Sequence, residues 1–467
     1  MTLTTTQFKT LKKLLPEARC FTQPEQCIAY SYDNSRLQQI PSAVLLAQSE
    51  TEISSIVAWC HQHKVALTCR GRGTGTAGAA VPEPGGVVIS LEQMDQIIKV
   101  DPANRVMVVE PGVTNQSIQD AATEHGFFWP PDPTSSAFCS VGGNLGCNSA
   151  GPRAVKYGSV RENTLGLRAV DGTGAAFSTG CYTTKGVVGY DLTRLLIGSE
   201  GTLSIITQAT LKLQPLPEQK QMLRLLYDSI HNAAEAVASI MAQPVIPYSL
   251  ELMDGKAINM IRDYANLELP DNAKALLLVE VDGSSATIGH SVSVIEQAAE
   301  NSGLIDIFHA KTEAQQAHLW RTRKALSPAL RTVAPKKINE DIVVPVASIP
   351  RLLEQLERIE ERHAIQIVTF GHAGNGNLHV NLLIDPSVPE QLAAAEKALD
   401  ELFRLTLELN GTLSGEHGIG RVKKNDVARE IDPVALGLMH AIKRQFDPNH
   451  ILNPSTTLPE GSALLKN

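Results

Sequence analysis

Apolar runs and amphipathic stretches alternate along the first part of the chain. Residues 43–47 and 65–69 are apolar, and they enclose the stretch 50–63, in which apolar positions recur at helical spacing. This arrangement predicts a β-α-β unit. The apolar run 85–90 predicts another strand, and 97–112 alternates around a turn as the strands of a β-hairpin do. Short strands mixed with helices in this way favour an α+β fold over a doubly wound sheet.

The pattern changes after Pro215 and Pro217, and we place a domain boundary near residue 217. Two strand-helix runs of similar layout follow, at 224–241 and 275–301, and they predict an antiparallel sheet with helices on one face. The further elements predicted are a helix at 115–126 capped by Thr114 or Asn115, a strand at 165–171, helices at 311–332 and 348–363, strands at 342–346, 365–370 and 378–385, and a helical tail at 425–452.

Composition and charge exclude several classes of protein. The 467 residues include 41 Lys and Arg against 49 Asp and Glu, and the net charge is -8. No basic block would follow a phosphate backbone, so we predict no nucleic-acid partner. No apolar run approaches the roughly 20 residues that span a bilayer. We expect a cytoplasmic protein, and peripheral contact with the inner face of a membrane is compatible with this expectation.

The seven cysteines form no Cys-x-x-Cys pair, and all of them lie before residue 182. We therefore expect reduced thiols rather than a disulfide framework or a zinc ribbon. Any iron-sulfur centre would have to come from another subunit.

A glycine-rich loop follows the predicted strand 65–69. It runs from Arg70 to Gly78 with the sequence RGRGTGTAG, and its glycines leave backbone amides uncovered. A diphosphate can approach such a loop and accept several N–H hydrogen bonds, which indicates nucleotide binding. On the residues alone a plain structural loop is equally compatible. The loop is not a Rossmann fingerprint, since no long helix opens at its third glycine.

Two further loops are rich in proline, glycine and small polar residues. Their sequences are PPDPTS at 130–135 and SVGGNLGCNSAG at 140–151. Proline stiffens such loops, glycine leaves room for a planar ligand, and the Ser, Thr and Asn side chains offer neutral hydrogen bonds. A flavin fits this inventory, and irregular surface loops are the alternative.

A second group of candidate residues surrounds the predicted hairpin. His372 and His379 emerge near its turn on neighbouring strands, where their imidazoles can converge, and Asn381 shares a sheet face with His379. A glutamate from the glycine-rich loop 415–420 would complete a two-His, one-carboxylate set that leaves open positions on a divalent metal. Turn or surface histidines are the alternative. The cations between residues 320 and 337 are suited to a carboxylate.

Several motifs occur in a characteristic order along the chain. The first set is RGRGTG at 70–75, PDPTS at 131–135, SVGGN at 140–144, KYG at 156–158 and GSEGT at 198–202. It resembles the flavin domain of the vanillyl-alcohol-oxidase superfamily. The second set is GHAGNGN at 371–377, LHVN at 378–381, GEHGIG at 415–420 and FDPNHILNP at 446–454. It resembles the FAD-linked D-2-hydroxyacid dehydrogenases, which include D-lactate dehydrogenases, the flavin subunit of glycolate oxidase and D-2-hydroxyglutarate dehydrogenase.

The resemblance covers roughly residues 10–460 and implies an α+β fold with two domains. Residues 1–217 would form a vanillyl-alcohol-oxidase-type (PCMH-type) FAD-binding domain. Residues 218–424 would form an antiparallel-sheet substrate-binding or cap domain with a metal site. Residues 425–467 would form a C-terminal helical segment that returns to the FAD domain.

The resemblance also implies that the cofactor is FAD, with its diphosphate on the loop that begins at Arg70. That loop contains no His or Cys, where some members of the superfamily carry a covalent flavin link, so we predict non-covalent FAD. The implied cofactor-binding residues are Arg70, Gly71, Gly73, Thr74, Gly75, Pro131, Asp132, Thr134, Ser135, Ser140, Gly142, Gly143, Asn144, Ala150, Gly151, Tyr157, Gly158, Glu200, Gly201, Ile206 and Asn453.

For the second site, the resemblance implies that His372, His379 and Glu416 bind a divalent metal, zinc or manganese, and that His417 is the catalytic base. The reaction would be oxidation of an alcohol beside a carboxylate. A metal at this position would lower the pKa of the hydroxyl group and fix the substrate geometry. The implied substrate-binding residues are Arg323 for the carboxylate, with Ser327, Lys337 and Asn381.

We therefore predict an FAD-dependent dehydrogenase that oxidises a D-2-hydroxy acid, with D-lactate favoured, to the 2-oxo acid. Glycolate and D-2-hydroxyglutarate are alternative substrates. Three alternatives are also compatible with the residues: a flavin subunit that mainly passes electrons and is inactive without its partners, an oxidase that uses oxygen, and a metal-binding module or hydrolase without flavin. The predicted electron acceptor is a quinone, a cytochrome, an electron-transfer flavoprotein or an iron-sulfur subunit, and a homodimer is compatible with this prediction.

Overall fold

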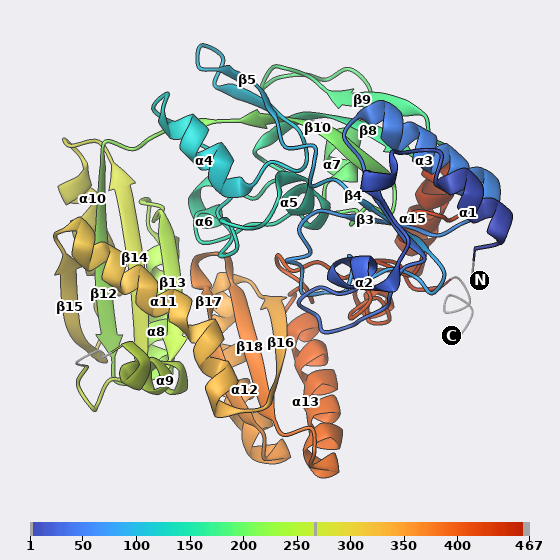
Figure 1. Cartoon of the computed structure of the whole chain (residues 1–467). Coiled ribbons are helices and arrows are strands. Elements are labelled where there is room, and N and C mark those ends of the chain that lie inside the picture. Colours follow the sequence, from blue (N-terminus) through green and yellow to red (C-terminus); the bar gives the residue numbers. More distant parts are fainter. Residues whose placement is uncertain (1–2, 266–268, 461–467) are drawn as a thin grey trace. The chain divides into compact units, whose positions relative to one another are not determined.

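The computed structural model describes residues 3–265 and 269–460. The chain divides into two compact units. Unit 1 consists of residues 1–150, 158–216 and 416–467, and unit 2 consists of residues 151–157 and 217–415. Figure 1 shows the elements of both units, coloured along the sequence.

These units differ from the predicted domains in two short segments. Residues 151–157 belong to unit 2, because lysine and tyrosine side chains of this segment bond to Asp282. Residues 416–424 belong to unit 1, because a backbone N–H of this loop donates to Glu200 at 2.9 Å. Each segment belongs to the unit whose distant residues it contacts. A change in the local pattern of apolar residues does not reveal such contacts.

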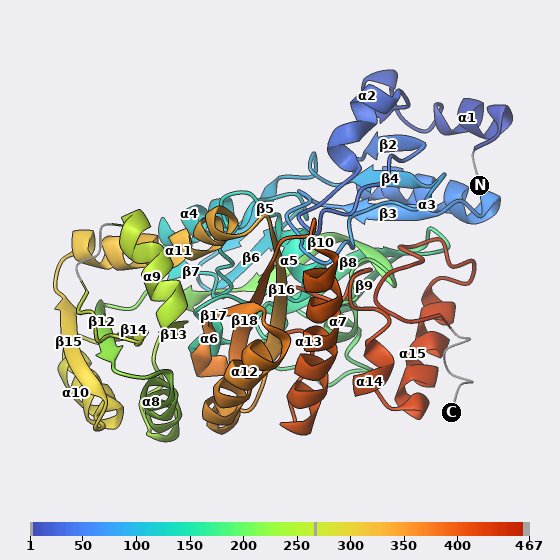
Figure 2. The same ribbon diagram turned by 90° about the horizontal axis from the view of Figure 1, so that it is seen from below.

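A β-α-β arrangement in unit 1 ends at the glycine-rich loop. Strand β2 (Ala43–Leu46), helix α3 (Glu50–His63) and strand β3 (Leu67–Arg70) occupy the predicted segments. Both strands pair in parallel with β4 (Val87–Ser90), which lies between them (Figure 2). Apolar side chains of α3 and of the three strands form one core. The prediction is confirmed, and β3 places the glycine-rich loop at the end of a buried sheet.

An antiparallel sheet forms the second layer of unit 1. Its strands, in spatial order, are β5 (Ile97–Asp101), β6 (Val106–Val109), β10 (Ser204–Lys212), β8 (Thr164–Asp171) and β9 (Ala176–Gly180). Strands β5 and β6 pair as the predicted hairpin. The helix that follows them begins after an N-cap threonine whose side chain accepts a backbone N–H, as predicted.

The C-terminal segment returns to unit 1, as predicted. Helices α14 (Val427–Glu430) and α15 (Pro433–Phe446) precede an extended stretch in which Leu452 bridges in parallel to Leu67 of β3. The predicted helical tail thus ends at Phe446 rather than at residue 452. The remaining elements of unit 1 are α1 (Thr5–Leu11), η1 (Glu17–Arg19), β1 (Cys20–Phe21), α2 (Pro24–Cys27), η2 (Ile28–Tyr30), α4 (Asn115–Thr123), β7 (Phe127–Phe128), α5 (Val141–Cys147), α7 (Leu192–Leu196) and β11 (Gln214–Pro215).

Unit 2 is built on an antiparallel sheet of seven strands in the order β15-β12-β14-β13-β17-β18-β16. The strands are β12 (Gln219–Tyr227), β13 (Ser249–Asp254), β14 (Ala275–Gly283), β15 (Leu304–Ala310), β16 (Lys336–Val343), β17 (Gln366–His372) and β18 (Asn377–Ile384). The helical elements are α6 (Ala154–Tyr157), α8 (Ile230–Ala242), α9 (Gly255–Ala265), α10 (Ile288–Ala299), α11 (Glu313–Val333), η3 (Val346–Ser348), α12 (Ile349–His363), η4 (Ala373–Asn375) and α13 (Pro389–Glu408).

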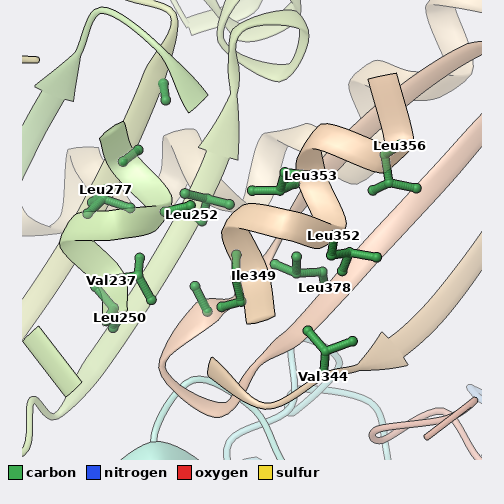
Figure 3. Packing of buried hydrophobic residues seen from close by; sticks show 14 of the residues in the cluster. Val237, Leu250, Leu252, Leu277, Val344, Ile349, Leu352, Leu353, Leu356 and Leu378 are labelled. Atoms are coloured by element: carbon green, nitrogen blue, oxygen red, sulfur yellow. The ribbon is translucent and has the colours of Figure 1, made fainter. Parts of the chain in front are cut away.

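Helices cover both faces of this sheet, so the prediction of helices on one face is wrong. Helices α8, α10, α12 and α13 pack on one face, and α9 and α11 pack on the other (Figure 2). In the first layer, Val237 of α8 and Leu352 of α12 lie against Leu252 and Leu378 of the sheet (Figure 3). The physical reason lies in the strands: residues Ala275 to Asp282 of β14 are all buried, and a sheet that is apolar on both faces needs two covers.

Several elements of unit 2 differ from the sequence expectation, among them β13, α9 and β15, which were not predicted. Strand β16 begins at Lys336, before the apolar run predicted at 342–346, because all eight of its residues pair with β18. Helix α13 was not predicted, although it starts with proline at a favoured position and is rich in Ala, Leu and Glu. Within residues 3–265 and 269–460, none of the helices combines the length and the apolar content needed to cross a membrane.

Candidate active site

The glycine-rich loop of unit 1 presents unpaired backbone donors. Among the residues that the structure describes, nothing accepts a hydrogen bond from the N–H groups of Arg72 to Thr76. Side chains are excluded at two of its glycines: a Cβ at Gly71 would lie 2.4 Å from Ser140 Oγ, and Gly73 has a φ of +65°. A loop that offers several backbone amides between glycines fits the diphosphate of FAD.

Arg70 supports this loop from the inside. Its guanidinium donates to the carbonyl oxygens of Tyr32 at 2.8 Å and Ala29 at 3.2 Å, and the residue is 6% exposed. Burial lowers the pKa of this guanidinium. A Cβ at Gly73 would collide with Arg70, so arginine and glycine together set the path of the loop.

Asp33 is a buried residue beside this loop that the sequence motifs did not reveal. Its Oδ1 accepts the N–H of Ser35 at 2.9 Å. Its Oδ2 lies 4.0 Å from the position of a Cβ at Gly75 and, within the described residues, has no hydrogen-bond partner. A buried carboxylate oxygen without a partner is costly, and a donor on a bound ligand would satisfy it.

Glu200 and Asn453, both predicted to bind the cofactor, hold loops together in unit 1. The Glu200 carboxylate accepts the N–H of Gly420 and the hydroxyl of Thr457 at 2.6 Å. Burial raises the pKa of Glu200. The Asn453 amide bonds to Cys69 N, Ala79 O and Glu200 O. These two residues therefore position the loops, and Gly201 lies against Asn453.

Most of the other predicted flavin residues lie in loops of unit 1 that hydrogen bonds tie together. Asn115 Nδ2 donates to Pro131 O at 3.1 Å and to Asn144 Oδ1 at 3.2 Å. The Ser140 hydroxyl caps α5 by accepting the N–H of Gly143. Unit 1 also holds Thr74, Asp132, Thr134, Ser135, Gly142, Ala150, Gly158 and Ile206, whereas Gly151 and Tyr157 belong to unit 2.

A second group of candidate residues lies on the face of the unit 2 sheet that α9 and α11 cover. Neighbouring strands bring polar residues together there. Phe370 of β17 pairs with His379 of β18, and His379 pairs with Asp341 of β16. His372 lies two residues after Phe370 and therefore on the same sheet face. The rings of His372 and His379 meet edge to face, with centroids 5.3 Å apart. The expected convergence of the two imidazoles is present.

Glu251 of β13 joins this group and was missed by the sequence analysis. Its carboxylate accepts the Nδ1–H of His372 at 2.5 Å and the Nε–H of Arg323 at 2.7 Å, and the residue is fully buried. Burial alone would raise the pKa of Glu251, but the facing charges and hydrogen bonds of His372 and Arg323 lower it to about 2. A charged residue inside an apolar strand requires such partners, which is the signal that could have identified it.

Asp341 is a second carboxylate that the sequence analysis missed. Its Oδ1 lies 3.8 Å from His379 Nδ1 and accepts Asn377 Nδ2 at 2.7 Å. Its Oδ2 accepts the backbone N–H of Gly415 at 3.0 Å. Two imidazoles beside a buried carboxylate fit a divalent ion of the zinc or manganese class. Because Nδ1 of His372 bonds to Glu251, Nε2 is the atom through which His372 would bind such an ion.

The predicted substrate-binding residues occupy different environments in unit 2. Arg323 of α11 stacks on Phe370 with its Cζ 4.9 Å from the ring centroid. Among the described residues, no side chain or backbone oxygen accepts from its Nη atoms. Lys337 donates to Ser327 at 3.1 Å. Asn381 is fully buried, and its amide bonds to Asn339, Val368 and His379.

Glu416 and His417 begin the last segment of unit 1. In the chain they follow directly after Gly415, whose N–H is bonded to Asp341 in unit 2. Glu200 anchors the same loop a few residues later, at Gly420.

The chain matches models of two protein families. Residues 41–180 match the FAD binding domain, and residues 216–457 match the C-terminal domain of FAD linked oxidases. The chain is 39% identical over 428 residues to glycolate oxidase subunit GlcD of Bacillus subtilis (strain 168), which covers 91% of each chain. It is 34% identical over 447 residues to D-lactate dehydrogenase of Anaerostipes hadrus, which covers 93% of this chain and 91% of that one.

Among solved structures, p-cresol methylhydroxylase with substrate bound resembles this chain with a TM-score of 0.78 at 18% identity, over 97% of each chain. The likeness shows the fold. Together with the two family matches it confirms the predicted fold class, an FAD-binding domain with an antiparallel-sheet domain. The chain belongs to the FAD-linked oxidase family and is an FAD-dependent oxidoreductase. The predicted cofactor FAD is thereby confirmed, and the individual residue roles stay predictions.

Proposed function

We propose that this chain oxidises a D-2-hydroxy acid to the 2-oxo acid, with D-lactate as the favoured substrate. The observation that carries the proposal is the group formed by Arg323, Glu251 and His372. A cation suited to a carboxylate and a histidine suited to a metal share one buried glutamate. The names of two relatives support this substrate class, because glycolate and D-lactate are both 2-hydroxy acids.

In the proposed complex, Arg323 binds the substrate carboxylate through its Nη atoms, with Lys337 and Ser327 on the same side. His372, His379 and Glu416 would hold the metal ion, and Asp341 adds negative charge beside His379. A bound divalent ion would lower the pKa of the substrate hydroxyl and orient it. The Glu251 hydrogen bond holds the His372 ring in one orientation throughout.

An imidazole nitrogen of His417 then accepts the hydroxyl proton, since histidine takes up protons near neutral pH. The C2–H bond breaks with its electron pair, and the C2–O bond becomes a carbonyl. FAD, when bound non-covalently, supplies the acceptor for this hydride. The proton would go to His417 and the hydride to FAD, so the product is the 2-oxo acid.

The glycolate oxidase flavin subunit is the second candidate, and the word subunit in the name of a 39% identical relative favours it. In that case the electron acceptor is an iron-sulfur partner. For the D-lactate candidate, the acceptor is a quinone, a cytochrome or an electron-transfer flavoprotein.

Anaerobic bleaching of the flavin absorbance on the purified, FAD-loaded chain tests the proposal. D-lactate, L-lactate, glycolate and D-2-hydroxyglutarate are compared, each with and without a metal chelator. We expect bleaching by D-lactate that the chelator abolishes. Bleaching by glycolate alone would favour the second candidate, and failure of all four acids would reject the reaction for the isolated chain.

A further inference from the structure

Glu251 contacts two residues to which the proposed function assigns different roles, His372 and Arg323. Its two carboxylate oxygens have different partners: Oε1 accepts from His372 Nδ1 at 2.5 Å, and Oε2 accepts from Arg323 Nε at 2.7 Å. The residue is fully buried on the central strand β13, so water does not replace either partner. Strand β13 lies outside the motifs at 70–202 and at 371–454, so neither set of motifs contains Glu251.

The consequence for His372 is a defined tautomer. A carboxylate only accepts hydrogen bonds, so the proton of a neutral His372 ring resides on Nδ1. Nε2 then carries a lone pair, which is the form that a metal ion requires. The same glutamate fixes the direction of Arg323, because Nε is held and the planar guanidinium stacks on Phe370 at 4.9 Å.

We infer that Glu251 is a positioning residue that couples metal binding by His372 to carboxylate binding by Arg323. The inference rests on the proposed function, since it assigns those two roles to the two partners of Glu251. Glu251 itself touches neither the substrate nor the reacting atoms in this assignment. It acts by offering two acceptors to two donors.

Glu251→Gln separates the two roles, because glutamine has nearly the same shape as glutamate but only one side-chain oxygen that accepts. Arg323 Nε is always a donor, so it keeps the remaining oxygen. The amide nitrogen then faces His372 Nδ1 as a donor, and the proton of the ring must move to Nε2. Glu251→Gln should therefore block the nitrogen that binds the metal while it leaves the arginine in place.

The experiment measures metal affinity and substrate kinetics on the FAD-loaded chain. The dissociation constant for Zn²⁺ and for Mn²⁺ is obtained by competition with a fluorescent chelator. We expect Glu251→Gln to weaken metal binding by about 10- to 100-fold, with FAD content unchanged. At saturating metal, its KM for the 2-hydroxy acid should stay within about twofold of the original value. Glu251→Ala, which removes both acceptors, should weaken metal binding and raise KM as well.

Glu280→Gln provides a matched control. Glu280 is a buried glutamate on the adjacent strand β14, on the same sheet face, and its partner is Lys220 at 3.3 Å. The control removes the same charge without touching His372 or Arg323, so metal affinity and KM should both stay unchanged. Equal weakening of metal binding in Glu280→Gln and Glu251→Gln would overturn the inference, since a general charge effect would then explain the loss.

A measurement on the unaltered chain gives an answer even where a variant does not fold. In metal-free protein labelled with ¹⁵N-histidine, the His372 ring should carry its proton on Nδ1, and the signal is assigned by its loss in His372→Gln. A proton on Nε2 overturns the inference, as does wild-type metal affinity in a folded Glu251→Gln variant. If the unaltered chain binds no metal and no acid bleaches its flavin, the proposed function itself fails. Failure confined to the Glu251 variants rejects only the coupling.

Discussion

Replacement of Asn453 by alanine should loosen three loops of unit 1 at once. Its side-chain oxygen accepts the N–H of Cys69 at 3.0 Å, and its side-chain nitrogen donates to the carbonyl oxygens of Ala79 at 3.2 Å and Glu200 at 2.6 Å. Asn453 is 4% exposed, so the groups it leaves behind have little access to water. These groups belong to the end of β3, to the residue that follows the glycine-rich loop and to the turn at Glu200.

The expected loss of stability follows from these contacts. A buried polar group left without a partner costs about 1–3 kcal/mol. Cys69 and Ala79 are partly exposed, so water offsets part of their loss, whereas the Glu200 carbonyl bears the full cost. The φ angle of Asn453 is 39°, and alanine is less favourable than asparagine in this left-handed region by about 1 kcal/mol. The free energy of unfolding of unit 1 should fall by about 3–5 kcal/mol.

Urea unfolding followed by circular dichroism measures this loss, and quenching of flavin fluorescence measures FAD affinity. We expect FAD to bind at least about tenfold more weakly, which corresponds to about 1.4 kcal/mol. Asn449→Ala is the matched control, since Asn449 lies in the same segment and, among the described residues, its side chain bonds to His61 alone. It should cost about 1 kcal/mol and leave FAD affinity unchanged.

Two results would contradict the expected role of Asn453. A loss of stability below about 1 kcal/mol would show that its three bonds contribute no more than the contacts of Asn449 with His61 in the control. A full loss of stability with unchanged FAD affinity would show that the loops keep their positions without Asn453, so that they are held by other contacts.

The remaining predictions concern the base, the cofactor and the pH dependence. His417→Ala should keep FAD and metal but lower turnover by about 10²- to 10⁴-fold in anaerobic bleaching; near-normal turnover would place the base elsewhere. Asp33→Asn should weaken FAD binding about tenfold in fluorescence titration, because it replaces the unpartnered Oδ2 by a donor; unchanged affinity would contradict a cofactor contact. Acid precipitation should release the flavin, and a yellow pellet would reject non-covalent binding. Burial raises the pKa of Asp254 from 3.8 to about 6, so the folded state holds this proton more tightly. The raised pKa of Asp254 therefore adds to the free energy of unfolding fully below pH 3.8, and this addition is lost as the pH rises to about 6. Relative to Asp254→Asn, the unaltered chain should lose about 1–3 kcal/mol in urea unfolding across this window; parallel curves for the two would contradict it.

Local patterns were sufficient for much of the fold. The β-α-β segment, the hairpin at β5 and β6 and the paired strands β17 and β18 all follow from apolar periodicity and turn residues. Helix α13 carried an adequate signal in its composition and was still not predicted. The second helical layer over the unit 2 sheet depends on burial of both faces of β14, and a run of apolar residues does not say what covers each face.

The family and the cofactor could be predicted from the sequence, because each motif that indicates them consists of residues close together in the chain. The role of the glycine-rich loop in holding the diphosphate stays a prediction. The residues that contact these motifs from other segments became known only from the tertiary structure. Asp33, Glu251 and Asp341 come from segments far from the motifs they touch, and strand pairing or loop packing brings them there. The tertiary structure also showed that Glu200 and Asn453, whose cofactor contacts stay predictions, hold loops of unit 1 together. The physical reason is the same in each case: a buried polar group must find a partner, and only the folded chain determines which partner lies within reach.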